Sequence, residues 1–198
     1  KWVSQWKQVS PTSTTPWITE SRLLFRLNRE EDGLRVLRQA SRRFSADADL
    51  ATILADSYSD SGNFAEAERI YWRLFEQSER LEDRLRWVTL LAEIKESLDQ
   101  TDELVAKLEE RRQGNPDSIE PLLVMAQVHQ VADNYEKRRD LLLEASRREP
   151  DNLLLLKELA RMEESEGDWQ RAQLTLEKAE KLDPSGSVSQ KMAEVCFK

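Results

Sequence analysis

The chain has 198 residues, of which 30 are Lys or Arg and 38 are Asp or Glu, giving a formal net charge of −8. Only five Gly and six Pro interrupt it, and 34% of its residues are charged, which favours an all-helical protein. No run of about 18 apolar residues exists, so we expect no membrane insertion. The acidic balance argues against binding to a phosphate backbone, so we expect no nucleic acid partner.

The single cysteine, Cys196, limits covalent and metal chemistry. It excludes an intrachain disulfide and a cysteine-ligated metal cluster. A lone cysteine slightly favours the cytoplasm, but exported bacterial proteins can also lack paired cysteines, so an exported or periplasmic location stays open. The chain starts at Lys1 rather than at Met, and the compartment is therefore unknown from the sequence.

Residues 1–13 are predicted to form an N-terminal segment with two tryptophans, Trp2 and Trp6, four residues apart on one face of a short helix. This stripe predicts a cap on the first repeat, the end of a preceding repeat, or a contact for another chain. Residues 11–16, PTSTTP, are predicted to be a loop. A weaker helical pattern then predicts a first helix pair with a turn at residues 28–32.

From residue 48 onward, apolar residues recur at intervals of three and four, which is the spacing of amphipathic helices. Pro116, Pro150 and Pro184 are 34 residues apart, so each interval predicts one helical hairpin. The segment SERLEDR lengthens one interval by three residues, as a longer connection or an extra turn of helix. Residues 187–198 are predicted to be a capping helix or a truncated repeat. The array is predicted to cover residues 14–186, divided into 14–47, 48–84, 85–118, 119–152 and 153–186.

The in-phase residues resemble the tetratricopeptide repeat family, whose fingerprint is W-x2-L-G-x2-Y, then A-x3-F, then P, on a 34-residue period. The Leu-Gly pair of the family corresponds here to Leu-Ala or Met-Ala pairs. These pairs end at Ala55, Ala92, Ala126 and Ala160. Three further family positions can be followed through the four hairpins. The Tyr position of the first helix holds Tyr58, Lys95, His129 and Glu163. The aromatic position after the turn holds Phe64, Thr101, Tyr135 and Trp169, and the small-residue position of the second helix holds Ala67, Leu104, Arg138 and Ala172.

The resemblance implies an all-α fold, namely a right-handed α-solenoid of antiparallel helix pairs that form a superhelix. In this family the first helices line a concave face, and most members bind peptides or protein partners there. The resemblance thus implies a protein or peptide partner and no catalytic activity. Leu104, Arg111 and Arg138 depart from the family pattern, and these departures predict locally looser packing or a partner surface.

The groove implied by the resemblance would be lined by first-helix residues that point away from the second helix. It would be basic at its start, acidic in the middle, neutral to apolar near Leu123, and mixed at its end. The carboxylate clamp of chaperone-binding members is absent, because its places hold Asp56, Glu93 and Gln127. An acidic middle favours a partner segment carrying Lys or Arg, although these charges could instead only keep the face soluble. The predicted groove consists of Arg22, Arg26, Asp56, Ser59, Asp60, Glu93, Glu96, Leu123, Gln127, Gln130, Lys157 and Arg161.

No pattern indicates catalysis, a metal site or a cofactor. His129 is the only histidine, and its place in the repeat is that of a core or groove-edge residue. Paired carboxylates such as Glu163 and Glu164 are typical of solvated helix faces. The five glycines are dispersed, so no glycine-rich loop is available to hold a phosphate.

The leading prediction is therefore a non-catalytic protein–protein interaction scaffold that binds a partner segment in its concave groove. One alternative is self-assembly into a homo-oligomer through Trp2, Trp6 and the terminal helix. A second alternative is an accessory domain of a larger enzyme or of a secretion or assembly protein.

Overall fold

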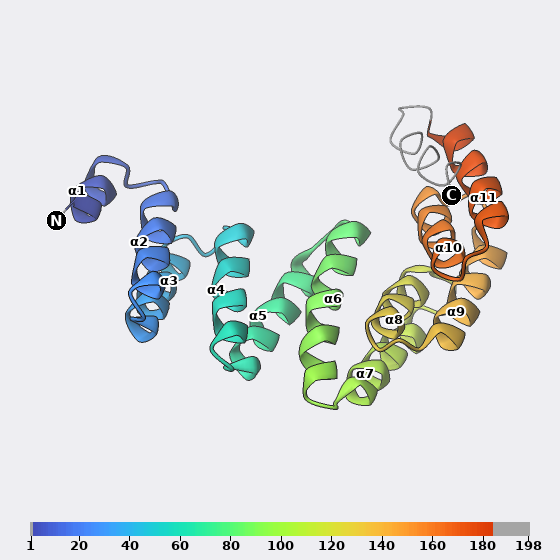
Figure 1. Ribbon diagram of the computed structural model, residues 1–198, viewed down its shortest axis with the longest axis horizontal. Helices are drawn as coiled ribbons and strands as arrows, with labels where there is room; N and C mark the ends of the chain where they lie inside the picture. The colour runs from blue at the N-terminus through green and yellow to red at the C-terminus, as the bar shows by residue number, and fades with distance from the viewer. Residues whose placement is uncertain (1, 184–198) are drawn as a thin grey trace. The chain divides into compact units, whose positions relative to one another are not determined.

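The computed structural model describes residues 2–183, with the side chains of Val3 and Ser4 left aside, and this part of the chain is all-helical (Figure 1). The capping helix predicted within residues 187–198 lies outside the described residues. None of the helices described combines the length and the hydropathy needed to cross a lipid bilayer. The helices are α1 (Trp2–Val9), α2 (Thr15–Arg26), α3 (Glu30–Arg43), α4 (Ala48–Asp60), α5 (Phe64–Gln77), α6 (Leu81–Ser97), α7 (Thr101–Gly114), α8 (Glu120–Val131), α9 (Tyr135–Arg148), α10 (Leu153–Ser165) and α11 (Trp169–Leu182).

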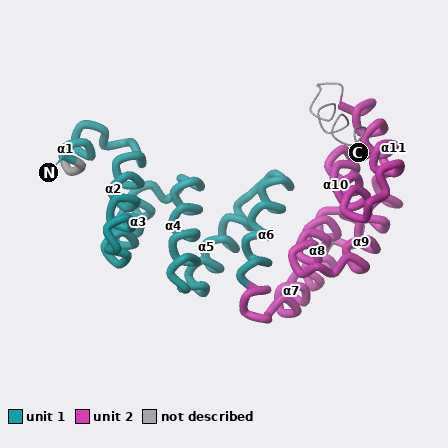
Figure 2. Tube along the Cα trace, in the orientation of Figure 1, with its two compact units in different colours: residues 1–94 teal, residues 95–198 magenta. Residues whose placement is uncertain are grey.

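The chain divides into two compact units (Figure 2). Unit 1 runs from Lys1 to Ile94 and contains α1 to α5 with most of α6. Unit 2 begins at Lys95 and contains the end of α6 together with α7 to α11. Each unit is built from consecutive helices that fold back on each other, which is the arrangement of a helical repeat fold.

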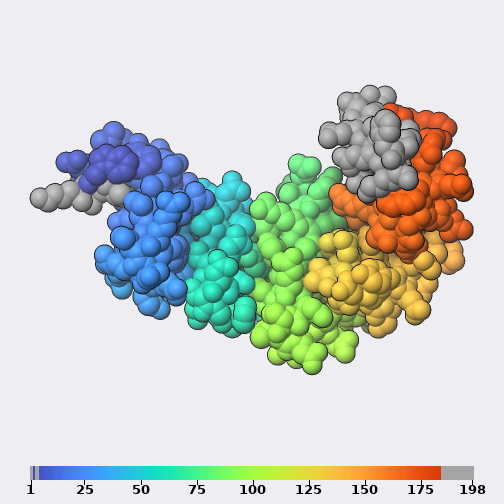
Figure 3. All heavy atoms as spheres, in the orientation of Figure 1, coloured from blue at the N-terminus to red at the C-terminus, as the bar shows by residue number. Residues whose placement is uncertain are grey.

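In unit 1, α2 packs on α3, α3 on α4, and α4 on α5, so two hairpins lie side by side (Figure 3). Close approach is possible because small residues occupy the contacts: Ser21 of α2, Ala40 of α3 and Ala55 of α4 are all fully buried. Large side chains such as Tyr71 and Leu37 fill the remaining space. The core of unit 1 is therefore a row of small-to-large contacts rather than one wide centre.

The sequence-based boundaries at the start of unit 1 need correction. The segment predicted as the loop PTSTTP already enters α2 at Thr15, and Pro16 occupies the first turn of that helix. Backbone N–H groups in the first turn of a helix have no intrahelical acceptor. Proline, which lacks an N–H group, therefore loses no hydrogen bond at this position. The observed turn is also shorter than the predicted turn at residues 28–32, because α3 begins at Glu30 rather than after Asp32.

The three-residue insertion in the repeat period lengthens a helix. Helix α6 begins at Leu81 and has 17 residues, whereas α4 has 13. The connection before α6 is fixed by hydrogen bonds, because Trp87 donates from Nε1 to Ser78 Oγ at 3.0 Å and Arg84 donates from Nε to the Ser78 carbonyl oxygen at 2.8 Å. Of the two sequence-based alternatives for SERLEDR, the extra turn of helix is the observed one.

In unit 2, α7 packs on α8, α8 on α9, α9 on α10, and α10 on α11. In the core of the last hairpin, Ala160 of α10 clusters with Ala172, Leu176 and Ala179 of α11. Trp169, the first residue of α11, packs against this cluster from the side of the turn. Large side chains thus fill the space that the alanines leave between the two helices.

Within residues 2–183, each of the five turns from a first to a second helix contains one residue in the left-handed backbone conformation. Such a residue reverses the chain direction directly after the first helix, and glycine, asparagine and aspartate adopt it at the lowest cost. Because Gly, Asn or Asp recurs at this position of each turn, the ends of the first helices could be predicted from the sequence. The residues and their φ angles are Asn28 (55°), Gly62 (73°), Asp99 (56°), Asp133 (51°) and Gly167 (77°).

Two of the three departures from the family pattern are core residues. Leu104 is 2% exposed and Arg138 is 3% exposed, so neither belongs to a partner surface, whereas Arg111 is exposed. For Leu104 and Arg138, this corrects the sequence-based alternative of a partner contact. Arg138 is the unusual case, because its guanidinium Nη2 is buried without a hydrogen-bond partner in the described part of the chain.

Candidate functional site

The predicted groove residues of unit 1 are mostly accessible. Asp56, Asp60 and Glu93 are exposed and Ser59 is half-buried, while Arg22 and Arg26 are exposed on α2. The three carboxylates come from the second half of α4 and from α6, which are the first helices of consecutive hairpins. All three carboxylates act electrostatically on the buried phenol of Tyr71.

We define the acidic face as Asp56, Asp60 and Glu93, the three carboxylates that act electrostatically on the Tyr71 phenol. Tyr71 lies on α5 and is 2% exposed, and its hydroxyl donates a hydrogen bond of 2.5 Å to Asp56 Oδ1. Burial raises the pKa of Tyr71, and Asp56, Asp60 and Glu93 raise that pKa further because each carboxylate opposes a negative phenolate. The phenol of Tyr71 therefore stays neutral.

The carboxylates of the acidic face have no basic partner among the residues that the structure describes. Asp56 accepts only the Tyr71 hydrogen bond, and neither Asp60 nor Glu93 forms an ion pair there. Some other acidic side chains of unit 1 are neutralised by neighbours, as in the pair of Arg69 Nη2 and Glu66 Oε2 at 2.7 Å. The acidic face thus consists of three carboxylates that form no ion pair among the described residues.

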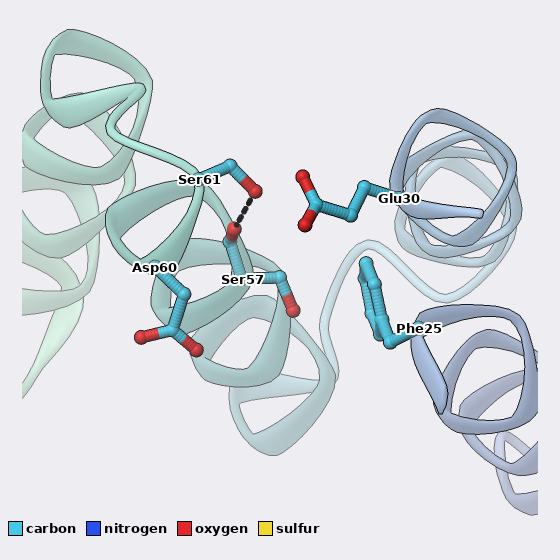
Figure 4. A pocket seen from close by; sticks show the side chains of 5 residues that line it. All are labelled: Phe25, Glu30, Ser57, Asp60 and Ser61. Atoms are coloured by element: carbon cyan, nitrogen blue, oxygen red, sulfur yellow. Dashed lines mark hydrogen bonds between the residues drawn. The ribbon is translucent and has the colours of Figure 1, made fainter. Parts of the chain in front are cut away.

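A hollow of about 240 Å³ lies beside the acidic face, between the first and second hairpins (Figure 4). Phe25 of α2 and Glu30 of α3 project from the first hairpin toward Ser57 and Ser61 of the second. Asp60 belongs to both the hollow and the acidic face. Phe25 and Glu30 are not among the residues predicted for the groove from the sequence. A signal was available, since Glu30 is 34 residues before Phe64 and takes the place of an aromatic residue.

The predicted groove residues of unit 2 do not form a comparable charged cluster. Glu96 accepts a hydrogen bond of 2.6 Å from Thr101 Oγ1, and Arg161 Nη1 pairs with Glu158 Oε1 at 2.5 Å. Leu123 is 2% exposed, which corrects its expected place on an open surface. The other three predicted residues, Gln127, Gln130 and Lys157, are half-buried.

The tryptophan pair at the N-terminus is only partly available for contacts. The Trp2 and Trp6 rings lie 5.2 Å apart between centroids, with Trp2 66% exposed and Trp6 half-buried. The next residue, Lys7, pairs with Glu20 and lies 3.4 Å from the centroid of the Trp17 ring, which fixes α1 on α2. An assembly contact through Trp2 and Trp6 stays a prediction.

His129 is a core residue with a titratable group. It is 5% exposed, and burial lowers its pKa; Lys137 lowers that pKa further, whereas Asp102 raises it. Because the folded pKa lies below the ordinary value of 6.5, the unfolded chain binds the proton more readily. Stability contributed by neutral His129 is therefore present above pH 6.5 and is lost as the pH falls toward the folded pKa.

We therefore expect acidification from about pH 7.5 to about pH 5.5 to lower the Tm of the wild type more than that of His129→Gln, by roughly 2–4 °C. Thermal unfolding followed by circular dichroism at both pH values measures this difference. Glutamine does not titrate, so the other ionisable groups affect both proteins alike. An equal loss of Tm in the two proteins would show that His129 does not contribute to acid sensitivity.

The described residues contain no group of three or more His, Cys, Asp or Glu side chains arranged to hold a metal ion. The carboxylates of the acidic face therefore form no such group. What these side chains can do is attract and orient a positively charged group.

Several solved structures share the fold of this chain. A thermophilic tetratricopeptide repeat protein of Thermus thermophilus aligns with a TM-score of 0.55 and 16% identity, over 94% of this chain and 100% of its own. PilF of Pseudomonas aeruginosa aligns with a TM-score of 0.47 and 14% identity, over 97% and 86% of the two chains. YrrB, a tetratricopeptide repeat protein with an unusual peptide-binding site, has a TM-score of 0.45 and 14% identity over 98% of each chain.

No protein-family model matches the chain, and no curated protein matches it in sequence. The likeness to the Thermus protein concerns the fold, since the identity is 16%. It agrees with the consecutive helical hairpins, the left-handed turn residues and the small-to-large contacts between paired helices. The chain is therefore an all-α helical repeat protein with the tetratricopeptide repeat fold.

Proposed function

We propose that this chain is a non-catalytic interaction scaffold that binds a Lys- or Arg-containing segment of a partner protein on the acidic face of unit 1. The observation that carries the proposal is the uncompensated charge of Asp56, Asp60 and Glu93 around the Tyr71 hydroxyl. A basic segment would supply the positive charges that unit 1 itself does not provide there. Helical repeat folds present such rows of first-helix residues to extended partners.

Charge complementarity also decides between partner classes. A phosphate backbone would be repelled by the acidic face, since nucleic acid binding depends on Lys and Arg side chains that neutralise phosphates. A basic peptide would be attracted before contact, which raises the association rate more than the affinity. Binding should therefore weaken steeply with salt, because exposed charges are screened within about 10 Å at 0.1 M ionic strength.

A panel of basic, neutral and acidic peptides, labelled for fluorescence anisotropy, tests the proposal. We expect the basic peptides to bind best, and Glu93→Lys to lower their affinity about tenfold through slower association. Glu110→Lys is the control, because Glu110 is exposed on α7 and makes the same change of charge outside the acidic face. Equal affinity in the two variants, or equal binding of all peptides, would contradict the proposal.

A further inference from the structure

We infer that the hollow between the first two hairpins of unit 1 is an anchor site for one arginine side chain, and that its lining recognises the guanidinium group. This inference rests on the proposed function, because the arginine would belong to the basic partner segment. The hollow has a volume of about 240 Å³, which is below the range of roughly 300–1,000 Å³ that is usual for small-molecule sites. Its size suits a single side chain.

The polar lining of the hollow consists of hydrogen-bond acceptors. Glu30 and Asp60 supply carboxylates that form no ion pair among the described residues. Ser57 Oγ donates to the Ile53 carbonyl oxygen at 2.7 Å, and Ser61 Oγ donates to the Ser57 carbonyl oxygen at 2.7 Å. Each hydroxyl has thus used its hydrogen, and its oxygen remains an acceptor. No Lys or Arg lines the hollow, so a ligand that only donates and carries positive charge is complementary to it.

The apolar wall of the hollow is the ring of Phe25, and its position depends on Gly33. A Cβ atom on Gly33 would lie 2.7 Å from Phe25 Cε1, so the ring occupies space that only glycine leaves open. In the last hairpin, the register counterpart of Gly33 is Ala172, and Trp169 packs against its cluster. The first hairpin has Glu30 in place of Trp169, and Phe25 covers Gly33 from α2 instead. This exchange puts an aromatic ring and a carboxylate side by side.

An aromatic ring beside a carboxylate favours arginine over lysine; the Glu30 carboxylate lies next to Phe25, whereas the Asp60 carboxylate points away from the ring (Figure 4). The planar guanidinium can stack on the ring of Phe25 while its N–H groups point outward toward carboxylate and hydroxyl oxygens. The ammonium group of lysine is more strongly hydrated and has no flat surface to stack. The site therefore predicts a preference for arginine within the basic segment.

The test uses the full chain labelled with ¹⁵N and titrated with N-acetyl-arginine methylamide, its lysine counterpart and its uncharged citrulline counterpart. We expect the arginine probe at millimolar concentration to shift the amide signals of Phe25, Glu30, Ser57 and Ser61. The lysine probe should bind more weakly, and citrulline should not bind. Absence of these shifts, or equal shifts with citrulline, would overturn the inference.

Two variants test the lining without large changes in folding. Glu30→Gln should weaken binding of the arginine probe about tenfold, since it removes one carboxylate. Glu31→Gln is the matched control, because Glu31 makes the same change on the adjacent residue and does not line the hollow. Gly33→Ala should also weaken binding by displacing the ring while every charge is retained. Unchanged binding in both Glu30→Gln and Gly33→Ala would remove this hollow as the site.

The outcomes separate this inference from the proposed function. Specific shifts at the hollow together with no binding of basic peptides would keep the arginine site and reject the scaffold function on the acidic face. Binding of basic peptides that depends on Glu93, with no shift at the hollow, would keep the function and reject the site. Failure of both titrations would reject both.

Discussion

Replacing Ala160 with tryptophan is expected to destabilise the last hairpin by about 1–3 kcal/mol or more. Ala160 of α10 is 1% exposed and faces Ala172 and Leu176 of α11, which are 0% and 2% exposed. An indole has no room in this contact, so either α10 and α11 separate or their side chains leave their preferred rotamers. Both changes reduce the apolar area that the hairpin buries.

Hydrogen exchange is the appropriate measurement for Ala160→Trp, because hairpins of a repeat array can open separately. Faster exchange should concentrate in α10 and α11, and thermal unfolding should begin at a lower temperature. Ala106→Trp is the matched control, since Ala106 is exposed on α7 and the same substitution there should cost only a few tenths of a kcal/mol. Equal stability of the two variants would show that Ala160 does not lie in a close helix contact.

Replacing Arg138 with leucine is expected to stabilise the chain by about 1–3 kcal/mol. Arg138 on α9 is 3% exposed, and its guanidinium Nη2 has no hydrogen-bond partner among the described residues. Burial lowers the pKa of Arg138, which reflects the cost of removing its charge from water, while the nearby carboxylates of Glu158 and Glu166 offset part of that cost. Leucine removes this cost and fills the same space with apolar atoms.

Two observations support the direction of this effect. Leu104 occupies the corresponding repeat position, 34 residues earlier, and is 2% exposed, so leucine is accommodated in this register. The neighbouring carboxylates also keep partners, because Glu158 pairs with Arg161 at 2.5 Å and Glu166 pairs with Arg139 at 2.6 Å. The substitution therefore leaves neither acidic group as an isolated buried charge.

Urea unfolding of Arg138→Leu and of Arg139→Leu gives a direct comparison. Arg139 is exposed, so leucine there loses an ion pair with Glu166 and gains little burial, and we expect no stabilisation. A higher midpoint for Arg138→Leu alone supports the account of a costly buried guanidinium. A lower midpoint for Arg138→Leu would instead mean that Arg138 contributes to stability through its attraction to Glu158 and Glu166.

The sequence allowed the hairpins to be predicted because the signals that define them are local. Apolar residues spaced by three and four residues define a helical stripe, and Gly62, Asp99, Asp133 and Gly167 mark the turns. The boundary near Thr15 differs because the composition of PTSTTP is typical of a loop, and the boundary near Glu30 lies where the helical pattern is weak and its register comes from later repeats. A proline in the first turn of a helix and a short turn both leave weak signals in a single sequence.

The candidate site was only partly predictable. Asp56, Asp60 and Glu93 are predicted to share one face because first-helix positions repeat in a known order, and the structure shows that all three are exposed. Leu123 could not be placed, since its exposure depends on how closely the neighbouring helices cover it. The hydrogen bond from Tyr71 to Asp56 joins residues 15 positions apart on two helices, and no local pattern indicates it.

The sequence by itself determined the helix periodicity, the turns and the acidic balance, because each of these depends on the identity and spacing of neighbouring residues. Only the tertiary structure decided which charges lack a partner and where a hollow remains. Those properties depend on contacts between helices, such as the packing of Phe25 of α2 against Gly33 of α3 and the position of Glu30 opposite α4. The physical reason is that compensation of charge and filling of space are settled between residues that are distant in sequence.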